Sequence, residues 1–171
     1  MKRSLKEYDI AFTGLKLGEH RFDYQLDNKF FSLFDYDEFL GADLHAEVRL
    51  VKKERSLEFH FSIKGTVEVP CDITTEPFHL PLASDMELVV KFGDEYDDSR
   101  DEILIIPASD HRMNIAQYLY EISVLALPLK RLSEKGRKIG EQEELKSAKS
   151  ENDHGANQMD PRWNKLKDLL N

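Results

Sequence analysis

The sequence predicts an α+β domain: an antiparallel, twisted or barrel-like sheet with one covering helix, followed by a C-terminal docking peptide. Two long segments, residues 57–73 and 78–92, carry apolar side chains at every second position, which is the period of a strand with one buried face. Residues 74–77 between them are typical of a turn. A third segment, residues 114–127, has apolar residues at helical spacing and stops at Pro128, so it predicts the covering helix.

Shorter alternating segments precede the long pair. Residues 8–12, 22–26 and 44–50 each alternate apolar and polar side chains, so we expect strands that join the long pair in a meander. The two long segments exceed the usual length of a strand. We therefore expect a bulge or a bend at Gly65 and within residues 81–85, because glycine and proline are tolerated at such places.

Two local features invite a functional interpretation. Residues 30–39 are rich in aromatic side chains, which could stack on bases, but core packing is favoured because Asp35, Asp37 and Glu38 surround them. Residues 93–102 hold six acidic residues, which could bind a metal ion. Their spacing does not follow that of a calcium loop, so a solvated loop is favoured.

In the predicted helix, Asn114 can act as the N-cap and Gln117 can complete a capping box. Composition then changes. We expect residues 1–129 to form the α+β domain, residues 130–159 a basic and polar flexible linker, and residues 160–171 a short helical docking segment. The docking segment could pack against the domain or against a partner, and its key residues are Asp160, Pro161, Arg162, Trp163 and Leu166.

Composition narrows the possible environment and partners. The 171 residues contain one cysteine, no apolar stretch long enough to span a membrane and no signal-peptide pattern, so a cytoplasmic protein is expected. The net charge of −9 is uneven, because residues 1–129 hold 14 Lys and Arg against 25 Asp and Glu, whereas residues 130–171 hold 10 against 8. An acidic body repels nucleic-acid phosphates, so any RNA contact is expected in the C-terminal quarter.

The residues available for such a contact form a basic stretch after the predicted helix. One interpretation is structural, since cations at the end of a helix complement its dipole. The other is contact with RNA phosphates or with a partner. The candidate contact residues are Lys130, Arg131, Lys135, Arg137 and Lys138.

Three stretches, in this order, resemble the YceD family of bacterial proteins, long known as a domain of unknown function. They are the strand of residues 67–71 with the turn of residues 72–78, the helix of residues 114–128, and the closing residues 160–166. The resemblance covers most of the chain and is weakest over the first forty residues. It implies a role in the accumulation of large-subunit ribosomal RNA, with a large-subunit precursor, rRNA or a ribosomal protein as partner.

The resemblance also raises the question of zinc, because many family members carry a second cysteine three positions after the first. Here that position is Thr74, and residues 130–138 hold no cysteine. Cys71 by itself cannot hold a structural zinc ion, so no metal and no cofactor is predicted.

No catalytic constellation is present in the sequence. The six histidines share no motif, Cys71 falls on the apolar side of its strand, and there is neither a glycine-rich phosphate loop nor a nucleophile elbow. We therefore predict a non-enzymatic factor without a small-molecule substrate, which supports large-subunit rRNA accumulation and assembly of the large ribosomal subunit. The alternative is a protein-interaction adaptor unrelated to ribosomes, using the acidic sheet and the Trp163 segment.

Overall fold

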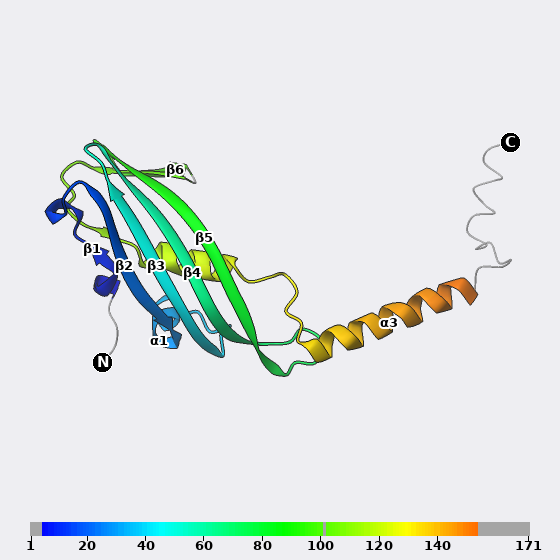
Figure 1. The fold of residues 1–171 in the computed structure, drawn as a ribbon. Coiled ribbons are helices and arrows are strands. Elements are labelled where there is room, and N and C mark those ends of the chain that lie inside the picture. Colours follow the sequence, from blue (N-terminus) through cyan, green and yellow to red (C-terminus); the bar gives the residue numbers. More distant parts are fainter. Residues whose placement is uncertain (1–4, 101, 154–171) are drawn as a thin grey trace, which may run out of the picture. The chain divides into compact units, whose positions relative to one another are not determined.

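The structure, a computed structural model, describes residues 5–100 and 102–153 (Figure 1). These residues divide into two compact units. The larger unit ends at Arg131 and omits Asp72–Thr74. Those three residues belong with the smaller unit, which continues from Leu132.

The larger unit is built on a six-stranded sheet whose order is β2-β3-β4-β5-β7-β6. All neighbouring pairs are antiparallel except β5 and β7, which run parallel. The strands are β2 (Gly18–Asp27), β3 (Gly41–Lys52), β4 (Ser56–Pro70), β5 (Pro77–Gly93), β6 (Asp97–Arg100) and β7 (Ile103–Pro107).

This sheet corrects two sequence-based expectations. It is not closed into a barrel, because β2 and β6 stand at its two ends. It is also not wholly antiparallel. The chain reverses direction after β5 to form β6 and reverses again to form β7, so that β7 runs in the same direction as β5. Mixed α and β structure, the coarser prediction, is confirmed.

Short elements and helix α2 (Ala116–Leu125) cover one face of the sheet, and Figure 1 shows α2 behind β3, β4 and β5. Asp27 caps the short helix α1 (Asn28–Phe31), because its Oδ1 accepts a hydrogen bond of 3.1 Å from the Phe30 amide. The other covering elements are η1 (Leu5–Tyr8), β1 (Asp9–Ile10), η2 (Phe12–Gly14), α1 (Asn28–Phe31), η3 (Ser32–Phe34) and β8 (Met113–Asn114).

The core follows the alternation seen in the sequence. The apolar positions of β3, β4 and β5 point to the covered face, and those of β3 and β4 are completely or almost completely buried. Phe30, Phe31 and Phe39 are buried against them, which confirms core packing for this aromatic stretch. The buried strand residues are Leu44, Ala46, Val48, Leu50, Leu57, Phe59, Phe61, Ile63, Val67, Val69, Leu82, Leu88 and Val90.

The expected bulge at Gly65 is absent, since β4 keeps its register with both β3 and β5 through this residue. Gly65 instead allows a close backbone approach. A Cβ atom there would lie 2.2 Å from the Asp43 carbonyl oxygen and 2.9 Å from the Leu44 Cα. Its φ of +157° is also one that side chains with a Cβ rarely adopt.

The start of α2 differs in detail from the predicted capping box. Asn114 does accept a hydrogen bond of 3.1 Å from the Ala116 amide. Gln117, however, donates to the Glu121 carboxylate one turn further on, at 2.7 Å, and so does not complete the box. A side-chain pair four residues apart has replaced the reciprocal cap.

The smaller unit contains α3 (Glu134–Asp153), which lies where we expected a flexible linker. The Ser133 hydroxyl accepts a hydrogen bond of 3.1 Å from the Gly136 amide, which is an N-cap contact. The stretch has low hydrophobicity, but Glu, Lys, Gln, Ala and Leu are among the best helix formers. Gly140 of α3 approaches Ile73, since a Cβ atom there would lie 3.2 Å from the Ile73 Cδ1.

Residues 160–171, which include the predicted docking segment, lie outside the described residues. Of the helices that the structure does describe, none combines the length and the apolar character needed to cross a lipid bilayer.

The close approach at Gly65 generates a prediction about stability. Replacing Gly65 with Ala should lower the free energy of unfolding by about 3 kcal/mol, because the new methyl group would overlap backbone atoms of β3 that cannot move away easily. Urea unfolding of the purified protein measures this. Gly14→Ala is the matched control, since no atom lies within 4 Å of a Cβ there, and its effect should stay within about 1 kcal/mol. Equal effects of the two substitutions would contradict the assignment.

Candidate functional site

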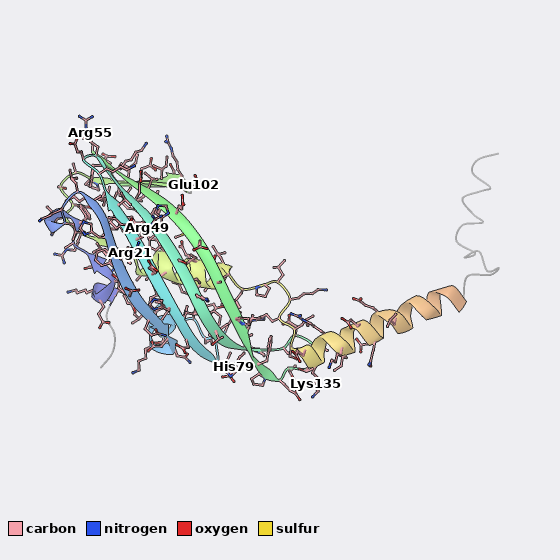
Figure 2. All side chains as sticks on the ribbon, viewed as in Figure 1. Arg21, Arg49, Arg55, His79, Glu102 and Lys135 are labelled. Atoms are coloured by element: carbon pink, nitrogen blue, oxygen red, sulfur yellow. The ribbon has the colours of Figure 1, made fainter. Side chains whose placement is uncertain are left out.

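The five candidate contact residues fall in two parts of the chain. Lys130 and Arg131 end the larger unit, and Lys130 is exposed. Lys135, Arg137 and Lys138 lie in the first turn and a half of α3, all three are exposed, and Figure 2 labels Lys135 at this end of the helix. We refer to these three residues as the α3 basic cluster.

The position of the α3 basic cluster bears on its interpretation. Exposed peptide N–H groups give the start of a helix a partial positive charge, so cations there are mildly unfavourable. The cluster stands at the start of α3, and the acidic residues Glu141, Glu143 and Glu144 follow it. These three cations therefore do not complement the dipole of α3, whereas the structural interpretation of the basic stretch concerned the end of the preceding helix, α2.

Arg131 has a structural partner within the larger unit. Its Nη1 atom lies 3.2 Å from Oε2 of Glu38, and its side chain is 26% exposed. Glu38 lies within the aromatic stretch of residues 30–39, of which Tyr36 packs edge-on against Tyr120 of α2, with ring centroids 5.7 Å apart. Arg131 therefore ties the end of the larger unit to this stretch, and it is a weaker candidate for RNA contact than the α3 basic cluster.

The open face of the sheet carries charged side chains of both signs, and several of them are paired. Arg21 and Arg49 project from neighbouring positions of β2 and β3 (Figure 2), and Glu19 lies 2.9 Å from the first and 3.8 Å from the second. His60 lies 3.0 Å from Glu87 on the adjacent strand. Because Arg21 and Arg49 have acidic neighbours, the open face is a weaker candidate for RNA contact than the basic stretch.

A cleft between β6, β7 and α2 was missed by the sequence analysis. It has a volume of about 720 Å³, and its floor is apolar. Tyr96, Asp98 and Arg100 line it from the side of β6, and Tyr118 and Glu121 from α2. The stretch interpreted as a solvated acidic loop thus contains the edge strand β6. The only feature of the sequence that could have indicated this strand was the spacing of positions 96, 98 and 100, and such a short pattern cannot be distinguished from a loop.

The residues that could bind a metal do not form a site. Among residues 5–100 and 102–153, no three His, Cys, Asp or Glu side chains gather as ligands. Cys71 is buried, as expected, and is the one cysteine of the sequence. A pair of thiolates three residues apart cannot form here because Thr74 occupies the second position.

The described chain is thus an acidic domain with a mixed sheet, joined to a charged helix that begins with cations. A model of the family described as Large ribosomal RNA subunit accumulation protein YceD matches residues 59–170. Because the match spans more than half of the chain, this protein belongs to the YceD family, as the three stretches indicated. The matched region begins within β4, includes α3, and leaves out β2 and β3. The comparisons with curated proteins and with solved structures gave no match.

The family description bears on function only in outline. It names the accumulation of large-subunit ribosomal RNA, and it mentions no catalytic activity. The ribosome-related part of the sequence-based prediction is therefore supported, whereas the contact residues and the absence of an enzymatic activity stay predictions.

Two tyrosines give the larger unit a pH dependence. Burial first, and nearby Tyr96 and Glu121 second, raise the pKa of Tyr118 to about 12. Burial and then Glu38 raise the pKa of Tyr36 to about 12 as well. Both hydroxyls ionise near pH 10 in the unfolded chain, so their contribution to stability is fully present below pH 10 and is lost as the pH rises towards 12.

We therefore expect the free energy of unfolding to fall between about pH 9 and about pH 11, and to fall less in Tyr118→Phe than in the unchanged protein. Urea unfolding at both pH values measures the change in the free energy of unfolding of each protein. Comparing the change in Tyr118→Phe with that in the unchanged protein removes the contribution of the lysines, which both proteins share. Equal losses in the two proteins would contradict the raised pKa of Tyr118.

Proposed function

We propose that this protein is a non-enzymatic factor that supports the accumulation of large-subunit ribosomal RNA and the assembly of the large ribosomal subunit. It acts in the cytoplasm on a large-subunit precursor and contacts RNA phosphates through the α3 basic cluster, with Lys130 contributing. Membership of the YceD family supports the process, and the charge distribution supports the contact.

The observation that carries the contact is the position of the cations on α3. Lys135, Arg137 and Lys138 are exposed at the end of the helix where its dipole disfavours them. A cost of this kind is offset when the cations meet phosphate groups, because each neutralised phosphate releases a counterion. Peptide N–H groups at a helix start also favour anions. Both the cationic side chains and the backbone at this end of α3 therefore favour a bound phosphate.

The acidic domain limits where RNA can be bound. Residues 1–129 have 11 more acidic than basic side chains, so they repel the phosphate backbone. Phosphate contact is then confined to the C-terminal part of the chain, and the domain remains available to proteins. Binding of this type depends on salt and reads little sequence.

Charge reversal of the α3 basic cluster tests the contact. The variant Lys135→Glu, Arg137→Glu, Lys138→Glu should bind large-subunit precursors at least tenfold more weakly at low salt, and its salt slope should fall by roughly one for each lost phosphate contact. Helix loss would not explain this result, because acidic residues are favourable at a helix start. Sedimentation of the tagged protein through sucrose gradients at several salt concentrations measures the effect.

The matched control reverses three exposed lysines of the larger unit, Lys29, Lys64 and Lys91, and so changes the net charge equally. It should sediment like the unchanged protein. If both variants lose association equally, the contact is general electrostatics and α3 is not its site. If the unchanged protein stays at the top of the gradient and cells without it have normal large subunits, the ribosomal function itself is contradicted.

For the docking segment we propose a role in partner binding. Among the described residues, the buried core of the larger unit runs from Tyr8 to Ser123. Removing residues 156–171 should therefore change the melting temperature little, while it weakens association with the precursor particle. A clear loss of thermal stability would show instead that the segment with Trp163 packs on the rest of the chain, because burial of a tryptophan contributes a few kcal/mol.

A further inference from the structure

The cleft between β6 and α2 has walls of different character. β6 is an edge strand, paired on one side with β7. Tyr96, which directly precedes β6, and Asp98 and Arg100 of β6 all line the cleft. From α2, Gln117, Tyr118 and Glu121 also line it. The cleft therefore lies beside a strand that, among the described residues, is paired along one edge only.

The two tyrosines in the cleft are held in place. The ring of Tyr118 stacks on the buried Phe61, with centroids 5.8 Å apart and an interplanar angle of 21°. The Tyr96 hydroxyl lies 3.4 Å from an Asp98 carboxylate oxygen. Burial first, and then Tyr96, Glu121 and Asp98, raise the pKa of Tyr118 to about 12.

The cations in the cleft already have acidic neighbours. Arg112 lies 3.7 Å from Asp9, which is outside the lining. Arg100 acts on Asp97, whose pKa is lowered mainly by hydrogen bonds from Ser99 and then by Arg100. The lining holds the three carboxylates of Asp98, Asp110 and Glu121 against the two guanidinium groups of Arg100 and Arg112, so its formal charge is negative.

We propose that this cleft binds an extended, basic peptide segment of a partner protein, with an arginine or lysine side chain seated between Tyr96 and Tyr118 and paired with Asp98 and Glu121. The segment lies along β6, whose free edge offers backbone hydrogen bonds to an added strand. Aromatic faces and carboxylates together form a site for a guanidinium or an ammonium group. The apolar floor takes the aliphatic part of the same side chain.

Nucleic acid fits this cleft poorly. A phosphate backbone would have to approach three carboxylates within an acidic domain. The two proposed surfaces thus bind partners of opposite charge: the start of α3 binds phosphate groups, and the cleft binds a basic protein segment. Naming a ribosomal protein as the source of that segment rests on the proposed function, whereas the peptide site itself does not.

The test uses the full chain and a fluorescent peptide of about six residues, the length of a typical strand, with arginine alternating with threonine. Fluorescence anisotropy should show binding, and a peptide with glutamine in place of arginine should bind at least tenfold more weakly. Asp98→Asn and Glu121→Gln keep the shape of each side chain and remove its charge. Each should weaken binding of the arginine peptide about five- to tenfold, and Tyr96→Ala should also weaken it.

Glu87→Gln is the matched control, because Glu87 is an exposed carboxylate on the open face of the sheet. It should leave the affinity unchanged. Equal losses for Glu87→Gln and Glu121→Gln would mean that the peptide is attracted by net charge only, which would overturn the proposal. Melting temperatures of the variants exclude unfolding as the cause of any loss.

A single-stranded RNA oligonucleotide of similar length is the competing probe. Binding of this probe that is lost in Arg100→Gln, together with no binding of the arginine peptide, would overturn the peptide site. Failure here is separable from failure of the proposed function. Peptide binding does not depend on the α3 basic cluster, and sedimentation with large-subunit precursors is measured independently of the cleft variants.

Discussion

Leu57, Phe59, Phe61 and Ile63 project from one side of β4 and are each at most 1% exposed, and the larger unit is arranged around their exclusion from water. Burying each such side chain contributes about 1.5–3 kcal/mol. β4 is paired along its length with β3 and β5, so its register sets which face of the neighbouring strands is apolar. The covered face then needs helix α2 and the N-terminal elements, and the open face is left to polar and charged side chains. The cleft arises where this cover meets the short edge strand.

Alternation in the sequence predicted much of this unit, because period two follows directly from the geometry of a strand. It predicted the buried positions of β3, β4 and β5 and the helix over them. The predicted barrel-like closure of the sheet was wrong, because alternation does not show which strands stand at the edges of a sheet. The direction of β7 was also missed, because an apolar run of four residues is the same in parallel and antiparallel pairs. α3 was missed because the interpretation relied on hydrophobicity, whereas its helix rests on the propensities of charged residues and a Ser133 cap.

For the candidate site, the sequence predicted which residues are basic but not where the fold places them. The basic residues were identified from the sequence, but the place of Lys135, Arg137 and Lys138 at the start of α3, where a helix dipole disfavours cations, was not. Arg131 appeared equivalent to its neighbours until its contact with Glu38 set it apart. The cleft could not be foreseen, because Tyr96 and Glu121 lie far apart in the sequence and meet only through the path of β6.

The membership of Asp72–Thr74 in the smaller unit has a topological consequence. The chain passes between the two units three times, after Cys71, after Thr74 and after Arg131, so the helix is not an appendage that begins where the sheet ends. A protein cut short at Arg131 would retain the Asp72–Thr74 tip but lose Gly140, which Ile73 approaches in the complete chain. Domain boundaries drawn along the sequence alone would therefore divide a packed unit.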